Sequence, residues 1–106
     1  MQSVTDAAFE SVVLESRIPV LVDFWAPWCA PCRAVAPVLA ELETEFAGRL
    51  NVVKMNVDEE NGVAGELGVR SIPTLVMFKD GKAVEGVVGA LPKAELRRLV
   101  DRHVEA

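Results

Sequence analysis

The alternation of hydrophobic and polar residues divides the chain into short segments. Pro19 precedes a nearly continuous apolar run over residues 20–25, and turn residues flank this run on both sides. Such a run is typical of a strand that is buried on both faces. We therefore expect residues 20–25 to form a central strand in a sheet that helices cover.

Four segments carry hydrophobic residues at helical spacing. They are a first helix capped by Thr5 or Asp6, helices over 29–47 and 61–68, and a last helix with Pro92 in its first turn. The positions expected to face inward are Phe9, Val12, Val13, Val35, Leu39, Leu42, Phe46, Val63, Ala64, Leu67, Leu96, Leu99, Val100 and Val104. Pro37 should kink the second helix, because proline lacks a backbone N–H.

Three more strands are expected over residues 50–57, 74–79 and 82–88. Asp80 and Gly81 join the last two strands, and this pair is a strong hairpin signal. The order strand, helix, strand over residues 20–57 implies a parallel pair with a right-handed crossover. The predicted fold class is therefore α/β, with a central mixed sheet (a parallel unit plus an antiparallel hairpin) and helices on both faces.

The composition adds limits to this picture. The 106 residues suffice for a single domain over 1–106, and 51% of them are hydrophobic, enough for one core. The net charge is −5 and no run of Lys or Arg occurs, so we expect no nucleic-acid partner. No apolar stretch reaches the roughly 20 residues of a membrane-spanning helix. The acidic start, residues 1–8, does not read as a secretory signal, which favours a cytoplasmic protein.

The two cysteines carry the candidate chemistry, since in a reducing compartment such residues are more often catalytic or metal-binding than structural. The segment Trp28-Cys29-Ala30-Pro31-Cys32 follows a strand and opens a helix. Helical rise then places the two Cα atoms about 5 Å apart, a distance that a disulfide spans. Free N–H groups and the helix dipole favour the thiolate of Cys29, the attacking species in thiol–disulfide exchange. Cys32 lies one turn further in and would be the resolving thiol.

Three alternatives to a redox pair exist for these cysteines. A zinc site needs about four ligands, whereas the chain adds only the distant His103 to its two cysteines. A structural disulfide across four residues would constrain the unfolded chain little. Inert cysteines would sit in apolar strands rather than beside Trp and Pro. We therefore expect a redox pair and no metal.

Residues 25–32, Trp-Ala-Pro-Trp-Cys-Ala-Pro-Cys, closely resemble the active-site segment of thioredoxins. The resemblance spans nearly the whole chain through Asp23, Pro37, Lys54, Ile72, Pro73, Thr74, Phe78, Gly81 and Gly89. It implies a general reductase for disulfides in partner proteins that uses Cys29 and Cys32, with no bound cofactor. It also implies re-reduction by a thioredoxin reductase that uses a flavin and NADPH. We expect the chain to be a monomer.

The sequence departs from the family pattern in two places. Ala30 stands where the family most often has Gly, which affects partner preference and redox potential rather than the reaction. The chain before the first helix is also short, so the opening edge strand should be stunted.

Asp23 is unusual, because a carboxylate in the middle of a central strand is costly to bury. Either strand curvature lets it reach solvent or a neutral partner, or it is buried with a raised pKa. In the second case it could take the proton of Cys32 through a water, the role that the resemblance favours. Lys54 would be a solvated charge at an edge, or would extend toward Asp23 and tune its pKa, as the family pattern supports.

The remaining candidates concern substrate binding. A trans Pro73 is the ordinary expectation, whereas the resemblance implies a cis proline beside the cysteines, with the Ile72 backbone free to pair with an extended substrate. Trp28 should form a platform on the partner-facing surface, with Trp25 packed inside. Gly89 and Ala90 form a loop of small residues that permits close backbone approach. For His103 we expect no catalytic role.

Two other functions stay open at this point. An oxidant or isomerase would act in an oxidising compartment and would require export. A scaffold or subunit of a larger assembly would use the same surface without redox turnover.

Overall fold

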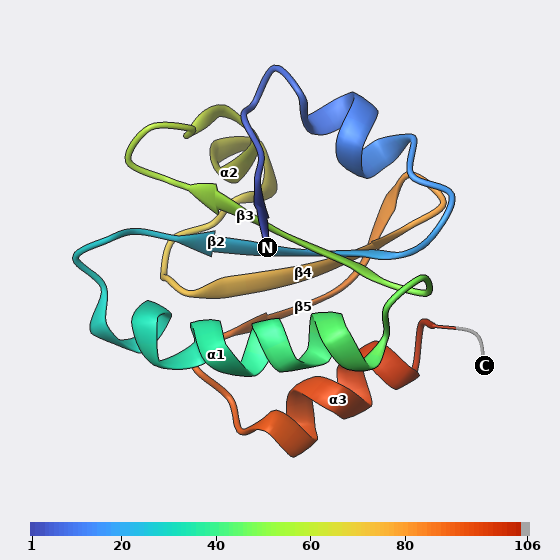
Figure 1. Ribbon diagram of the computed structural model, residues 1–106. Helices are drawn as coiled ribbons and strands as arrows, with labels where there is room; N and C mark the ends of the chain where they lie inside the picture. Colours follow the sequence, from blue (N-terminus) through green and yellow to red (C-terminus); the bar gives the residue numbers. More distant parts are fainter. Residues whose placement is uncertain (105–106) are drawn as a thin grey trace.

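The computed structural model describes residues 1–104, which form a five-stranded mixed sheet between two layers of helices (Figure 1). The strands are β1 (Gln2–Ser3), β2 (Val20–Trp25), β3 (Asn51–Asn56), β4 (Thr74–Lys79) and β5 (Lys82–Val88). The helices are the π-helix η1 (Glu10–Leu14) and the α-helices α1 (Ala30–Glu45), α2 (Gly62–Leu67) and α3 (Lys93–Asp101). The order across the sheet is β1-β3-β2-β4-β5. The strands β1, β3 and β2 are parallel to one another, and β4 pairs antiparallel with both of its neighbours, β2 and β5. The predicted fold class is confirmed.

The central strand is β2, which is buried on both faces as its apolar pattern predicts. Leu21 packs with residues of α1 and α3, whereas Val22 and Phe24 pack with residues of η1 and α2. Because side chains alternate along a strand, Asp23 points to the same face as Leu21. The strand therefore presents this carboxylate to the layer formed by α1 and α3.

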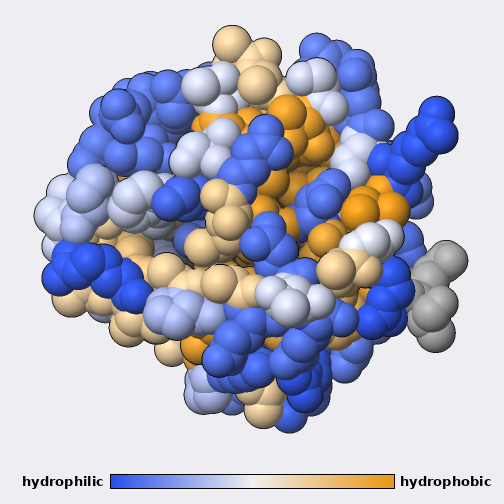
Figure 2. All heavy atoms as spheres, in the orientation of Figure 1, coloured by the Kyte–Doolittle hydropathy of each residue, from blue (hydrophilic) through white to orange (hydrophobic). Residues whose placement is uncertain are grey.

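The hairpin and the flanking helices follow the predicted pattern. Asp80 and Gly81 both have positive φ, 53° and 78°, as a tight hairpin turn requires. A bulge between Met77 and Phe78 interrupts the pairing of β4 with β5. The helix α1 runs through Pro37 without ending there. Hydrophilic residues dominate the lower edge of the molecule, where the solvent side of α3 lies (Figure 2).

The opening segment follows the prediction in its strand and differs from it in its helix. The strand β1 has only two residues, as the short chain before the first helix predicts, whereas the first helix is reduced to the five-residue π-helix Glu10–Leu14, whose N-cap residue makes no side-chain hydrogen bond within residues 1–104. Thr5 instead caps the preceding turn, where its Oγ1 accepts a backbone N–H at 3.1 Å. Asp6 accepts the N–H groups of Gly62 and Val63 at 2.8 and 3.0 Å, so it caps α2. Its assignment to the first helix was wrong, because its partner Gly62 lies 56 residues away in the sequence.

Leu67 was expected to face inward and is instead 40% exposed. The helix α2 has six residues and ends at Gly68, whose φ of +73° reverses the chain. This reversal brings back Val69, whose N–H donates to the carbonyl of Ala64 at 2.9 Å and whose side chain packs against the core. The prediction for Leu67 was wrong because Val69 takes the inward position instead.

Within residues 1–104, no helix combines the length and the apolar character that crossing a bilayer requires.

Candidate active site

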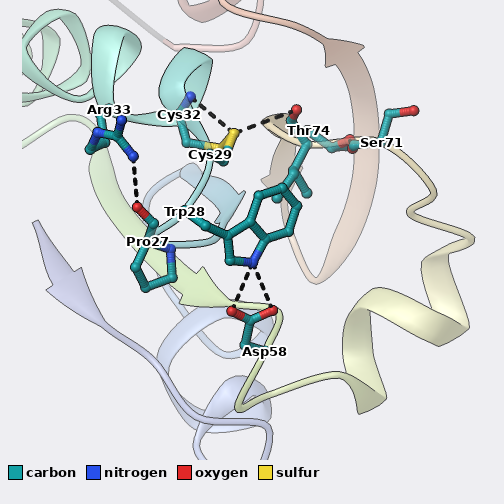
Figure 3. The surroundings of a disulfide bond; sticks show 9 residues. Pro27, Trp28, Cys29, Cys32, Arg33, Asp58, Ser71 and Thr74 are labelled. Carbon is teal, nitrogen blue, oxygen red and sulfur yellow. Dashed lines mark hydrogen bonds between the residues drawn. A yellow bond between two sulfur atoms is a disulfide. The ribbon is translucent and has the colours of Figure 1, made fainter.

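Cys29 and Cys32 form a disulfide at the N-terminus of α1, and their Cα atoms lie 5.2 Å apart. Cys29 is the N-cap residue, and its Sγ accepts the backbone N–H of Cys32 at 3.2 Å (Figure 3). Pro31 fits the first turn, where an N–H has no partner within the helix. The predicted spacing is confirmed. Both cysteines are buried in this oxidised state, so they differ little in exposure.

A second segment lies against the sulfur of Cys29. The carbonyl oxygen of Ile72 is 3.8 Å from Cys29 Sγ, and the peptide bond between Ile72 and Pro73 is cis. The carbonyl of Pro73 accepts the N–H of Gly89 at 2.8 Å, which joins the third segment to the site. Gly89 has a φ of +102°, and Ala90 after it is exposed. The cis form implied by the resemblance is therefore observed, and three distant segments meet at one end of the sheet.

Trp28 is 68% exposed and stands beside the disulfide on the surface. Its Nε1 donates to both carboxylate oxygens of Asp58, at 3.0 and 3.3 Å (Figure 3). Sequence reasoning missed Asp58. The available signal was its position directly after a strand parallel to β2, because such strands end at the same edge of a sheet. Trp25 is only half-buried and packs against the buried cluster of Ala26, Cys29 and Cys32.

A hollow of about 310 Å³ adjoins Trp28 and Ile72. Its walls include Val57 after β3 and Ala64 of α2, and Arg70 is its charged member. The hollow is therefore mostly apolar and opens next to the reactive sulfur.

Asp23 is buried, with 2% of its surface exposed, and its Oδ1 has no hydrogen-bond partner among residues 1–104. Burial raises the pKa of Asp23 from 3.8 to about 7, while the nearby Lys54 charge acts in the opposite direction. The alternative of a solvent-exposed Asp23 was wrong, because β2 has strands on both sides and α1 above it. Asp23 thus titrates near neutral pH.

Lys54 lies directly opposite Asp23 in the register of β2 and β3. On its other side it pairs with Ser3 of β1, so it does not occupy a free edge. Its Nζ lies 4.9 Å from the centre of the Trp25 ring. The alternative of a merely solvated edge charge was therefore wrong, and Lys54 lowers the pKa that burial raises.

Asp23 lies in the C-terminal half of β2 and points to the sheet face that α1 covers. Trp25, two residues on, packs against the buried cluster of Ala26, Cys29 and Cys32. Among residues 1–104, the carboxyl group makes no direct hydrogen bond to Cys32. Any proton transfer between them would need a bridging group, such as the water expected from the sequence.

His103 lies at the other end of the sheet and contributes to a surface cluster. Its Nε2 is 2.8 Å from Glu85 Oε1, and Arg102 also binds this carboxylate. Hydrogen bonds from Arg102 and then His103 lower the pKa of Glu85 to about 2. Across residues 1–104, no group of three or more His, Cys, Asp or Glu side chains is placed to hold a metal ion.

Comparison with known proteins decides the family. A sequence model of the family described as Thioredoxin matches residues 1–102. The chain belongs to the thioredoxin family. It is 57% identical over 102 residues to Thioredoxin 1 of Synechococcus elongatus, covering 96% of this chain and 95% of that one. It is 54% identical over 101 residues to a thioredoxin of Haemophilus influenzae, covering 95% of this chain and 94% of that one. It is 52% identical over 102 residues to the chloroplastic Thioredoxin M-type of Chlamydomonas reinhardtii, covering 96% of this chain and 73% of that one.

Members of the thioredoxin family are disulfide oxidoreductases, and the Cys29–Cys32 pair stands where that chemistry requires it. The chain is accordingly a dithiol–disulfide oxidoreductase that acts on disulfide-containing proteins. The recognition of the family and the redox function expected from the sequence are confirmed.

Proposed function

We propose that this member of the thioredoxin family is a general protein-disulfide reductase that a thioredoxin reductase returns to the dithiol state. The observation that carries the proposal is the position of Cys29 Sγ. It accepts the Cys32 N–H at the start of α1 and lies 3.8 Å from the Ile72 carbonyl, beside the exposed Trp28. Donors at a helix N-terminus favour an anion, so the reduced Cys29 is the nucleophile.

In the first step, the Cys29 thiolate attacks one sulfur of a substrate disulfide. A mixed disulfide forms as the substrate S–S bond breaks, and the released substrate sulfur takes up a proton. No bound cofactor or metal takes part.

The substrate binds in extended form beside this sulfur. Among residues 1–104, the backbone of Ile72 has no backbone hydrogen-bond partner, so it is open to a substrate strand. Pro73 holds the Gly89 loop through its carbonyl, and the small Gly89 and Ala90 leave room for a partner backbone. A substrate side chain would enter the apolar hollow next to Trp28.

In the second step, Cys32 loses its proton to Asp23 through a bridging water. A pKa of about 7 suits a base that must accept and return a proton at neutral pH. The Cys32 thiolate then attacks Cys29 Sγ, the mixed disulfide breaks, and the substrate leaves with its second sulfur reduced. Two electrons and two protons pass to the substrate, and the Cys29–Cys32 disulfide forms.

Regeneration reverses this exchange through the reductase, so NADPH acts on the chain indirectly. We propose a single-domain monomer in the cytoplasm that binds neither nucleic acid nor membrane. Ala30 and Pro31 are exposed at the tip of the site, where Ala30 adjusts partner preference.

The test is insulin reduction driven by NADPH and a thioredoxin reductase. Cys29→Ser should abolish turnover, whereas Cys32→Ser should leave a trapped mixed disulfide. Full turnover by Cys29→Ser would overturn the mechanism. Biological activity retained by the double Ser variant would favour a scaffold, and an equilibrium potential well above that of the glutathione pool would favour an exported oxidant.

A further inference from the structure

A second hollow, of about 300 Å³, lies at the end of the sheet opposite the cysteines. Val20 at the start of β2 pairs with Asn51 and with Phe78, so the residues just beyond these three share one end. In Figure 1 the chain around residues 17–19, 48–49 and 79–80 gathers at the right, whereas α1 starts at the left. This hollow is therefore separate from the redox site.

The walls of this hollow are cationic in an acidic protein. Arg17, Arg49 and Lys79 line it, together with His103, and within residues 1–104 Asp80 is the single carboxylate among the lining residues. The chain as a whole has a net charge of −5. A local excess of cations against that background is a marker of an anion site.

Arg17, Arg49 and Lys79, like most basic residues of the chain, form no ion pair with a carboxylate of residues 1–104, so their charge is open to an anion. Lys93 and Arg97 both pair with Glu45, and Arg102 pairs with Glu85. Like charges that face one hollow repel each other unless an anion joins them.

Neighbouring groups hold the Arg49 side chain in place and leave space for a ligand beside it. The guanidinium of Arg49 lies 5.0 Å from the centre of the Phe46 ring and donates to the Glu45 carbonyl at 3.5 Å. Among residues 1–104, the other N–H groups of this guanidinium donate no hydrogen bond. Gly48 has no atom within 4 Å of the position that a Cβ would occupy, so its backbone is open. Ile18 and Pro19 add an apolar wall.

We propose that this hollow binds a small phosphate-bearing ligand, with its phosphate oxygens on Arg17, Arg49 and Lys79 and its organic part on Ile18 and Pro19. Three cations suit a multiply charged anion better than a single carboxylate. Guanidinium groups match phosphate through paired N–H donors. The volume is in the range of small-molecule sites.

The test is a titration of the full ¹⁵N-labelled chain with inorganic pyrophosphate at low ionic strength, followed by amide chemical shifts. Saturable shifts should occur at the amides of residues 17–18, 48–50 and 79–81, with a Kd of about 1 mM or tighter, and not at the cysteines. The double variant Arg17→Gln/Arg49→Gln should weaken binding by about tenfold or more, because two charge-assisted contacts are lost.

The matched control is Arg33→Gln/Arg98→Gln, which removes the same charge from exposed positions that line neither this hollow nor the one beside Trp28. It should change the pyrophosphate Kd by less than about twofold. An equal loss in both double variants would reduce the effect to general electrostatics and overturn the proposal. Shifts that do not saturate, or equal binding of acetate, would also overturn it.

Discussion

Two carboxylates associated with the same helix behave in opposite ways. Asp23 lies in the core beneath the layer that contains α1, and burial raises its pKa to about 7. Glu45 lies at the exposed C-terminal end of α1, where hydrogen bonds from Lys93 and then Arg97 lower its pKa. The residue class is the same, but one group has lost water and the other has gained cations.

This difference separates a carboxylate that can take part in proton transfer from a carboxylate that only forms surface ion pairs. A buried carboxylate with an open oxygen can exchange a proton near neutral pH, whereas an exposed ion pair stays ionised and is screened by solvent. Asp6 is intermediate, because it is half-buried and accepts the N–H groups of Gly62 and Val63. Substitutions of Asp23, Asp6 and Glu45 test whether the effect on stability decreases in that order.

The largest effect is expected for Asp23→Asn. A folded-state pKa raised above 3.8 favours the protonated form, so wild-type stability falls as pH rises from 3.8 toward 7. Near pH 8 the variant should be more stable by roughly 3–4 kcal/mol, and near pH 3 by little. Urea unfolding at both pH values measures this difference. An equal gain in the free energy of unfolding at the two pH values would contradict the raised pKa of Asp23. Insulin reduction by the variant should also be slower.

A smaller effect is expected for Asp6→Ala. Loss of a side-chain cap should lower the free energy of unfolding by about 1 kcal/mol, and amide exchange at Gly62 and Val63 should accelerate. Asp6→Asn keeps one acceptor oxygen and serves as the control. If Ala and Asn were equally stable, Asp6 would not act as a cap for α2.

Lys54→Met sharpens the account of Asp23. Removal of the opposing charge should move the pKa of Asp23 above about 7, since burial would then act alone. The measurement is an NMR titration of the Asp23 carboxyl carbon, with Lys79→Met as a control at the far end of the sheet. An unchanged or lower pKa in Lys54→Met would exclude tuning by Lys54.

The smallest effect is expected for Glu45→Gln. Its ion pairs with Lys93 and Arg97 are exposed, so the free energy of unfolding should be nearly unchanged at moderate salt. Urea unfolding in low and high salt checks this result. A loss comparable to the change at Asp23 would remove the distinction between the two carboxylates.

Elements with a strong local pattern could be predicted from the sequence. The apolar run of β2, the turn at Asp80 and Gly81, and the helical spacing of α3 depend on neighbours in the chain. Leu67 and Asp6 could not be placed in this way. The chain reversal at Gly68 and a partner 56 residues distant decide their positions.

The candidate site divides along the same line. The spacing of Cys29 and Cys32 predicts their geometry, because one helical turn fixes it. The burial of Asp23 could be decided only from the strand order of the sheet, since an acid in an apolar run is compatible both with a solvent-exposed and with a buried carboxylate. The predicted parallel pair of strands places Asp58 and Trp28 at the same edge of the sheet, but their hydrogen bond depends on where each strand ends, which the sequence pattern does not fix.

The shapes of the outermost strands have a consequence for behaviour in concentrated solution. The strand β1 covers β3 only at Val53 and Lys54, and β5 is interrupted by the bulge opposite Met77 and Phe78. Neither border offers a long, regular row of free N–H and C=O groups. Growth of the sheet from one molecule into the next, the first event in fibril formation, is therefore disfavoured on both sides.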